Sequence, residues 1–365
     1  MSERLPVRDA LFSFVAQEPL RAALFLTYSF DGRWFEEALV PGLCERPIAT
    51  MLVVRDRNAI VSEAPSVRYR KANACTSAVF HPKLALLISE NSARAVISSA
   101  NLTRGGFERQ RELGRVFDLA PNLLGDRHVF EMLLDYLQNG LAREVRGDAS
   151  RDLREISSAL TEMVQQYERP VEQSPQVVLH NYQESIWSQI LTRLPHRVLR
   201  RAVIVSPFFE PDRQGAEDPA LGPDDASIFA RALFHDFKFE ADKNEPAVRV
   251  LFRHSQGRTE LPVQKLSALK DRIAFFAQDE REQRLHAKFV MLEGVDSGGR
   301  EPFLATLYGS PNFTTAGLLQ RPPNGNSELA VLTVLPPKRR RFDQVLEQLQ
   351  LESGFTRVAD ITELQ

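Results

Sequence analysis

One ordered set of polar residues occurs twice in this chain, and no other feature limits the fold as strongly. Each copy begins with His-x-Lys, continues with Ser-x-Asn and ends with a glutamate. The residues are His81, Lys83, Ser99, Asn101 and Glu112 in the first copy, and His286, Lys288, Ser310, Asn312 and Glu328 in the second. With 7 His and eight Lys in the chain, chance predicts only about 0.15 His-x-Lys triplets. The duplication therefore indicates two related halves built on the same plan.

The elements predicted around the two copies also recur in order. Apolar runs bounded by turn residues predict strands, and apolar residues at spacings of three and four predict helices. The first half is predicted to hold strands at 22–28, 49–54, 77–88, 93–98 and 113–119, with helices at 35–43 and 126–141. The second half is predicted to hold strands at 202–209, 247–252, 273–276, 285–292, 303–308 and 329–335, with helices at 227–237 and 263–273.

The stretch between the halves is predicted to be helical and charged. Leu153, Ile156, Leu160 and Met163 recur at helical spacing, and a further helix is predicted at 183–194. We therefore predict an α/β fold of two pseudo-symmetric αβ(α) units, each a mixed sheet flanked by helices, joined by a helical linker. The expected boundaries are 1–145 for the first unit, 146–200 for the linker and 201–365 for the second unit.

Composition excludes several classes of protein. With 43% hydrophobic and 26% charged residues, the 365-residue chain is neither disordered nor fibrous. Two cysteines, Cys44 and Cys75, cannot make a disulfide framework or a cysteine-based zinc site. No apolar run approaches the roughly 18 residues of a membrane-spanning helix, and the charged N-terminal stretch is unlike a secretory signal, so a cytoplasmic protein is expected.

The charge balance gives no global attraction for polyanions. Because the formal net charge is -2, any anion binding must be local. Local cationic groups are Arg68, Arg70 and Lys71, then Arg104, Arg109 and Arg111, and finally the run 338–341. The favoured interpretation of each group is an ordinary solvated surface, and for the run 338–341 it is a charged face that opens a C-terminal helix.

The repeated residues suit phosphodiester chemistry. Residues two apart on a strand share a face, so each histidine would emerge with a lysine beside it. Each asparagine follows a strand and precedes a helix-like segment, where an amide and backbone donors can hold phosphate oxygens. If a pseudo-twofold axis joins the halves, both sets meet at one site. We expect no metal or other cofactor to be needed, because lysines and asparagines would stabilise the phosphoryl charge.

A two-step mechanism follows from the paired histidines. One would attack phosphorus to form a phosphohistidine while the other protonates the leaving oxygen, and the roles would reverse for water. Glu112 and Glu328 would accept a hydrogen bond from the far nitrogen of each imidazole. Glu90 and Glu108 are rivals for the first carboxylate, but Glu112 opens a predicted strand as Glu328 does.

Other residues near the motifs have weaker claims. Tyr28, Phe30, Phe208 and Phe209 end the first strand of each half, where core packing and stacking of a base are equally compatible. A lone histidine is usually structural, and companions of the repeated kind are absent around His128, His180, His196, His235 and His254. Substrate contacts are expected from Ser99, Ser310 and Arg104.

These motifs resemble those of the phospholipase D superfamily, which carries a duplicated His-x-Lys followed by Asn and, in many members, an Asp after the lysine. The resemblance covers about 22–119 and 202–335, with Ile88 and Glu293 at the Asp positions. The pattern is more similar to that of tyrosyl-DNA phosphodiesterases, whose halves carry His-x-Lys, Asn and a later Gln or Glu. It is also similar to bacterial phospholipase D-like nucleases with two motifs in one chain. The resemblance implies that His81 is the nucleophile and His286 the general acid.

Three functions are compatible with the sequence. The leading one is a metal-independent phosphodiesterase that cleaves nucleic acid, DNA in particular. A lipid phosphodiesterase or transphosphatidylase would need an apolar interfacial surface, whereas a nucleic-acid-binding subunit of a bacterial defence or repair complex would need no nucleophile. Two motifs in one chain allow a monomer to build the whole site, although a dimer stays open. A helicase or other defence-system partner is implied by resemblance alone.

Overall fold

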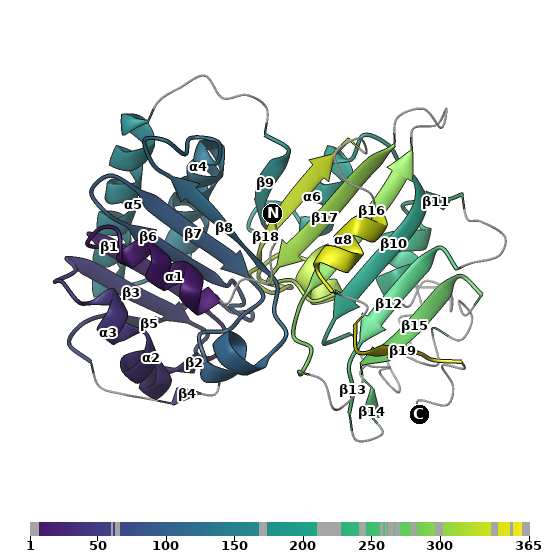
Figure 1. Cartoon of the computed structure of the whole chain (residues 1–365), viewed down its shortest axis with the longest axis horizontal. Coiled ribbons are helices and arrows are strands. Elements are labelled where there is room, and N and C mark those ends of the chain that lie inside the picture. The colour runs from purple at the N-terminus through teal and green to yellow at the C-terminus, as the bar shows by residue number, and fades with distance from the viewer. Residues whose placement is uncertain are drawn as a thin grey trace.

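Two β-sheets lie side by side in the computed structural model, each with helices on both faces (Figure 1). The structure describes residues 7–59, 61–62, 66–167, 174–209, 228–240, 246–255, 258–259, 261, 266, 271–278, 283–295, 302–336, 342–350 and 353–359. The predicted α/β class with two mixed, helix-flanked sheets is confirmed. None of the helices in these ranges combines the length and apolarity needed to cross a membrane.

The first sheet has the strand order β5-β3-β1-β6-β7-β8. Its strands are β1 (Ala22–Thr27), β3 (Thr50–Arg55), β5 (Arg70–Asn73), β6 (Leu84–Ile88), β7 (Ala93–Ser98) and β8 (Gly114–Leu119). β1, β3 and β5 run parallel, whereas β6, β7 and β8 each run antiparallel to the strand before them in that order. A separate short pair is formed by β2 (Phe30–Asp31) and β4 (Val61–Ser62).

Alternate residues of β1 feed two cores, as the period of a strand requires. The helices around this sheet are α1 (Val7–Val15), α2 (Gly32–Ala38), α3 (Val40–Leu43), α4 (Arg127–Asp135) and α5 (Asp148–Gln166). Ala23 and Phe25 pack with α1, α2 and α3 on one face. Leu24 and Leu26 pack with α4 and α5 on the other. Because helices cover both faces of the sheet, β1 is buried along its whole length, and its residues do not alternate between apolar and polar.

The second sheet follows the order β19-β15-β12-β10-β16-β17-β18-β9, with β11 paired to β10. Its strands are β9 (Gln176–His180), β10 (Val198–Ser206), β11 (Lys238–Phe239), β12 (Val248–Phe252), β15 (Ile273–Gln278), β16 (Phe289–Val295), β17 (Phe303–Gly309), β18 (Leu329–Leu335) and β19 (Phe355–Arg357). A short hairpin is made by β13 (His254–Ser255) and β14 (Arg258–Thr259). One face packs on α6 (Ile186–Arg193) and the π-helical turn η5 (Ala230–Phe234), and the other on α8 (Phe342–Gln348).

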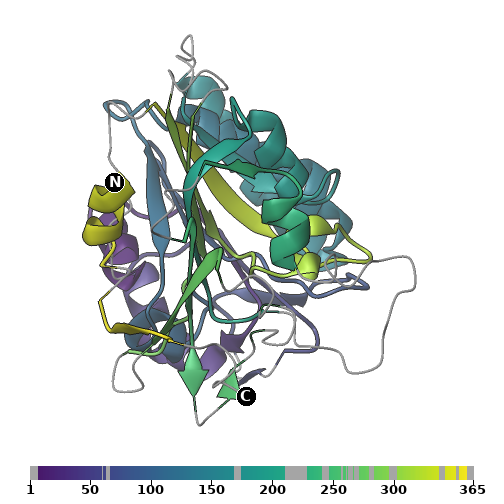
Figure 2. The same cartoon turned by 90° about the vertical axis from the view of Figure 1, so that its right-hand side faces the viewer.

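The two sheets share a common plan. The series β3-β1-β6-β7-β8 corresponds strand by strand to β12-β10-β16-β17-β18, with the same parallel and antiparallel pairings. In the side view, α8 and the N-terminal helices lie on one side of the sheets and the teal helices on the other (Figure 2). An approximate twofold axis between the two units accounts for this arrangement, because such an axis places corresponding helices of the units on opposite sides of the sheets.

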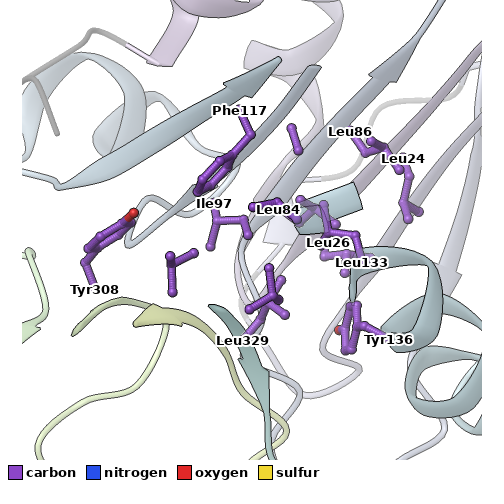
Figure 3. Packing of buried hydrophobic residues seen from close by; sticks show 14 of the residues in the cluster. Leu24, Leu26, Leu84, Leu86, Ile97, Phe117, Leu133, Tyr136, Tyr308 and Leu329 are labelled. Atoms are coloured by element: carbon purple, nitrogen blue, oxygen red, sulfur yellow. The ribbon is translucent and has the colours of Figure 1, made fainter. Parts of the chain in front are cut away.

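The segment 146–200 is divided between the two units. Its first helix, α5, packs on β1 and β3 of the first sheet, and its strand β9 joins the second sheet beside β18. One apolar core then continues across both units. Ile97 and Phe117 of the first sheet belong to the same cluster as Tyr308 and Leu329 of the second (Figure 3). The halves are thus joined by packing as well as by a connection.

Several predicted elements have different limits. The strands predicted at 77–88 and 285–292 begin only at Leu84 and Phe289, so both His-x-Lys triplets precede their strands. The helix predicted at 126–141 is α4 followed by a π-helical turn, η2 (Tyr136–Gly140), and a 3-10 turn, η3 (Leu141–Arg143). Most of the helix predicted at 263–273 lies outside the described residues, as do the beginning of the 227–237 helix and the cationic run 338–341.

Candidate active site

Each His-x-Lys triplet occupies an extended stretch directly before a strand that pairs with the first strand of its unit. His81 and Lys83 precede β6, and His286 and Lys288 precede β16. The four side chains are buried, with exposed fractions of 8% for both histidines, 1% for Lys83 and 2% for Lys288. Each ammonium folds back onto its own triplet, because Lys83 Nζ donates to the His81 carbonyl at 2.7 Å and Lys288 Nζ to the His286 carbonyl at 2.7 Å.

The backbone around each histidine is paired with the other half of the molecule. Isolated parallel bridges join Phe80 to Ser327 and Arg111 to Leu285. The His81 N–H donates to the Ser327 carbonyl at 3.0 Å, and the His286 N–H donates to the Arg111 carbonyl at 3.0 Å. The residues that accept these bonds are the ones just before Glu328 and Glu112.

This crossed pairing places each glutamate beside the histidine of the other unit. His81 Nδ1 lies 3.0 Å from Glu328 Oε2, and His286 Nδ1 lies 2.6 Å from Glu112 Oε1. A carboxylate at Nδ1 holds the imidazole with its proton on that nitrogen and leaves Nε2 for chemistry. Both units therefore contribute to one site, and each of these two histidines is oriented by a glutamate of the other unit.

The two serines of the motif hold the glutamates. Ser99 and Ser310 are fully buried, and their hydroxyls donate to Glu112 and Glu328, respectively. Each hydroxyl also accepts the backbone N–H that follows the glutamate, at 3.0 Å for Ser99 and 2.9 Å for Ser310. Both hydroxyl groups are thus engaged by the protein, whereas substrate contact was expected. The third residue expected to bind substrate, Arg104, is exposed and pairs with Glu108 at 3.0 Å.

Asn101 and Asn312 follow the ends of β7 and β17, each before a π-helical turn. The turns are η1 (Gly105–Arg109) and η7 (Thr315–Leu319). Asn101 Oδ1 accepts from the Ser29 N–H at 3.4 Å. Asn312 Oδ1 is buried and has no hydrogen-bond partner within the described ranges. Both asparagines keep amide atoms that a bound group could engage.

Glycine lets each turn approach its asparagine. A Cβ on Gly106 would lie 2.4 Å from the Asn101 carbonyl oxygen, and one on Gly317 would lie 2.7 Å from that of Asn312. Any larger residue would collide with backbone at both places. The glycines at these two positions are a further shared feature of the halves.

The predicted aromatic positions divide into two roles. Tyr28 contacts the His81 ring edge-on at 5.6 Å, and Phe208 contacts the His286 ring edge-on at 6.1 Å. Both are partly exposed, so each walls a histidine. Phe30 and Phe209 are instead buried in apolar cores.

Several other residues considered from the sequence make structural hydrogen bonds or ion pairs away from the paired histidines and glutamates. Arg70 is paired with Asp148 and Asp152 of α5. Glu108 accepts from the Trp34 indole at 2.9 Å, and Glu90 is exposed, so neither replaces Glu112 at His286. Of the lone histidines, His128 bonds the Gln176 carbonyl, His180 bonds Asp135 and His235 is exposed.

Burial dominates the electrostatics of the site. Burial, helped by Lys288, lowers the pKa of His286 to about 4, and burial lowers the pKa of His81 in the same way. Burial also lowers the pKa of Lys288 to about 8 and that of Lys83 well below its usual range. Burial alone would raise the pKa values of the two glutamates, but the facing histidines and lysines outweigh it and lower them. At neutral pH, neutral imidazoles therefore donate to ionised carboxylates.

Three supporting residues were not anticipated. Thr27 ends β1 and accepts the Leu102 N–H at 2.9 Å, while Ser206 ends β10 and accepts the Phe313 N–H at 3.1 Å. These bonds tie the loops after Asn101 and Asn312 to the first strand of each unit. The sequence did carry a signal for Thr27 and Ser206, because a hydroxyl residue ends the first strand of each unit. Asn181, from the 146–200 segment, accepts the Glu328 N–H at 2.8 Å and had no counterpart to indicate it.

The site combines two lysines with the paired histidines and glutamates. Within the described residues, no three His, Cys, Asp or Glu side chains gather in a way that could hold a metal ion. Two buried lysine side chains lie in the site and, when protonated, supply the positive charge that phosphoryl oxygens require.

Comparisons with known proteins identify solved structures of similar fold but no matching sequence. No protein-family model matches the sequence, and no curated protein sequence matches it significantly. The structure is similar to tyrosyl-DNA phosphodiesterase of yeast, with a TM-score of 0.55 and 13% identity over 88% of this chain and 84% of that one. It is also similar to phosphatidylserine synthase of Haemophilus influenzae, with a TM-score of 0.57 and 12% identity over 100% of this chain and 88% of that one. At these identities the likeness concerns the fold.

Proposed function

We propose that this chain, whose fold is similar to those of tyrosyl-DNA phosphodiesterase and phosphatidylserine synthase, is a phosphodiesterase of the phospholipase D superfamily acting on nucleic acid, DNA in particular. The observation that carries the proposal is the pair of crossed His–Glu contacts beside two buried lysines. All of these groups come from the two halves and meet at one place. A single chain thus holds a complete set of groups for phosphoryl transfer.

The buried lysines call for an anionic ligand. Burying an ammonium is costly unless an opposite charge compensates it. Within the described residues, neither Lys83 nor Lys288 forms an ion pair with a carboxylate. Burial lowers the pKa of both lysines, and the charges of Glu112 and Glu328, which act in the opposite direction, only partly offset it. A phosphodiester placed between them would supply the missing charge and would gain stabilisation in a transition state with more charge on its oxygens. Asn101 and Asn312 would add neutral donors to the same oxygens.

The two histidines have different roles in the two steps of the reaction. His81 Nε2 attacks phosphorus, and the bond to the leaving oxygen breaks as His286 Nε2 gives that oxygen a proton. In the second step His286 takes a proton from water, whose oxygen attacks phosphorus and releases His81. For the first step His286 gains a proton at Nε2 from solvent as the substrate binds, because the negative charge of the substrate raises its pKa and counters the effect of burial, whereas His81 stays unprotonated at Nε2. Glu112 and Glu328 hold each ring and stabilise its cationic form, and Ser99 and Ser310 position those carboxylates.

The surface features support nucleic acid over lipid. Arg109 is exposed on η1, three residues before Glu112, and Tyr28 and Phe208 offer aromatic faces beside the histidines. A lipid interface would need a contiguous exposed apolar patch. The large apolar side chains exposed among the described residues are Val67, Val79 and Leu123, from three separate segments.

Cleavage assays in EDTA test the proposal. Labelled single- and double-stranded DNA and RNA, and phosphatidylcholine vesicles, would be incubated with the wild type, His81→Ala, His286→Ala and the exposed control His235→Ala. We expect cleavage of nucleic acid by the wild type and the control, and a loss of at least about a thousandfold in both site variants. An acid-labile phosphoryl adduct on His81 would accompany turnover.

Three outcomes would contradict the proposal. Full cleavage by either site variant would remove the paired-histidine mechanism, and abolition by EDTA would require a metal. Hydrolysis of lipid in the vesicles without cleavage of nucleic acid would show that the substrate is a lipid.

A further inference from the structure

The residues before Glu112 and Glu328 join the two halves, and the side chains at these two positions are anchored differently. Ser327 donates its N–H to the Val79 carbonyl at 2.8 Å and accepts from His81, and Arg111 donates to the Arg284 carbonyl at 2.8 Å and accepts from His286 and Ala287. The Ser327 side chain is held by the buried carboxyl of Glu144, at 2.6 Å. The Arg111 side chain is held by a segment near the C-terminus.

Arg111 reaches from the first unit into the C-terminal segment of the second. Only 5% of it is exposed. Its Nη1 donates to the Ser353 carbonyl at 2.7 Å, and its guanidinium lies 5.6 Å from the centre of the Phe355 ring. We call residues 353–357 the C-terminal strap.

The strap also contacts the strand that leads to His286. Its β19 pairs with β15, with Phe355 opposite Gln278. Gln278, the last residue of β15, accepts the Leu285 N–H at 2.8 Å and donates to the Gln283 carbonyl at 2.5 Å. A closed ring of contacts therefore runs from the strap through Arg111 to His286, back through Leu285 and Gln278, and returns to the strap.

We propose that Arg111 and the C-terminal strap form a clamp that sets the distance between Glu112 and His286, so that Arg111 is a positioning residue for the step that depends on His286. This inference rests on the proposed function. Arg111 acts through its backbone, which carries Glu112 on one side and bonds the His286 and Ala287 N–H groups at 3.0 and 2.8 Å. If the clamp is loosened, the 2.6 Å contact between His286 and Glu112 is the first to open.

The expected defect is selective for the leaving group. An alkoxide needs a proton as it departs, whereas p-nitrophenolate is stable without one, so only the first depends strongly on the general acid. Arg111→Met keeps the length and apolar stem but removes the anchoring bond. We compare kcat/KM, which reports only the steps up to departure of the leaving group, because His286 also serves the second step for both substrates. We expect the ratio of kcat/KM for a DNA oligonucleotide to kcat/KM for bis(p-nitrophenyl) phosphate to fall about tenfold, since a misplacement of about 1 Å can cost about a hundredfold.

Matched variants separate positioning from folding. Phe355→Leu weakens the same clamp from the strap side and should shift the ratio in the same direction, and Arg111→Lys should restore part of it. Ser327→Ala loosens the equivalent position at His81, the nucleophile, and should lower both rates together. Thermal unfolding of each variant checks that the fold is intact.

The outcomes are distinguishable. Equal effects of Arg111→Met and Ser327→Ala on the ratio, or no effect of Arg111→Met on either rate, would overturn the clamp. A selective effect of Ser327→Ala with an unselective one of Arg111→Met would support the clamp and exchange the roles of the two histidines. Failure of the wild type to hydrolyse either substrate would instead contradict the proposed function.

Discussion

Lys288 makes the site sensitive to alkaline pH. Its ammonium is charged below its pKa of about 8 and neutral above it, so its stabilisation of the phosphoryl oxygens is present at neutral pH and is lost as the pH rises. We expect kcat/KM for DNA cleavage, which reports the free enzyme, to fall as the pH passes through about 8. A pH series with a labelled DNA substrate measures it. A profile that stays flat to about pH 10, near the ordinary lysine pKa, would contradict this role.

At the scale of residues, the repeated pattern predicted which side chains belong together but not how they pair. The duplication selected His81, His286 and both glutamates, because chance does not repeat such a set. It could not show that each glutamate faces the histidine of the other half, since a linear order carries no information about which half supplies a neighbour. The serines were assigned to substrate for the same reason, because their contact with the glutamates depends on strand geometry.

The π-helical turns after Asn101 and Asn312 leave no room for a larger residue at Gly106 and Gly317. In Gly106→Ala the added methyl would meet the Asn101 backbone, which cannot rotate away. We expect a loss of about 1–3 kcal/mol in the free energy of unfolding and a fall in cleavage rate of about tenfold as Asn101 is displaced. Urea unfolding and the DNA assay measure the two effects. The control is Gly125→Ala, where nothing lies within 4 Å, and equal stabilities for the two variants would refute the steric argument.

At the scale of elements, most strands were predictable because their apolar runs are buried on both faces. Two of the predicted strands were started too early, because the stretches 77–83 and 285–288 are apolar enough to look like strand but lie before β6 and β16. Phe80 and Leu285 instead bridge to the other half. A partner from a distant part of the chain diverts these stretches from their own sheets, and local pattern does not report such a partner.

Binding of an oxyanion should stabilise the whole molecule, because the site is built from both halves and one core continues between them. Tungstate, a tetrahedral anion, at about 100 times its Kd would add about 2.7 kcal/mol and raise Tm by a few degrees. Differential scanning calorimetry at constant ionic strength measures the shift. The double variant Lys83→Met with Lys288→Met should lose it, and an equal shift in that variant or with chloride would exclude binding at the lysines.

At the scale of the molecule, the two-unit architecture could be predicted and the use of the connecting segment could not. Apolar spacing identified the helix that became α5, but spacing does not say which sheet a helix covers. β9 was missed because a short strand at a sheet edge leaves a weak pattern, and only pairing with β18 defines it.

The crossed pairing has a consequence for how the protein is made. Glu328 orients His81, which precedes it by 247 residues, and the strap that holds Arg111 comes later still. A ribosome that has released the entire first motif has therefore produced a histidine without its carboxylate. Proteolytic fragments of either half share that defect. Any activity that needs both oriented histidines would thus arise only when translation and folding of both halves are complete.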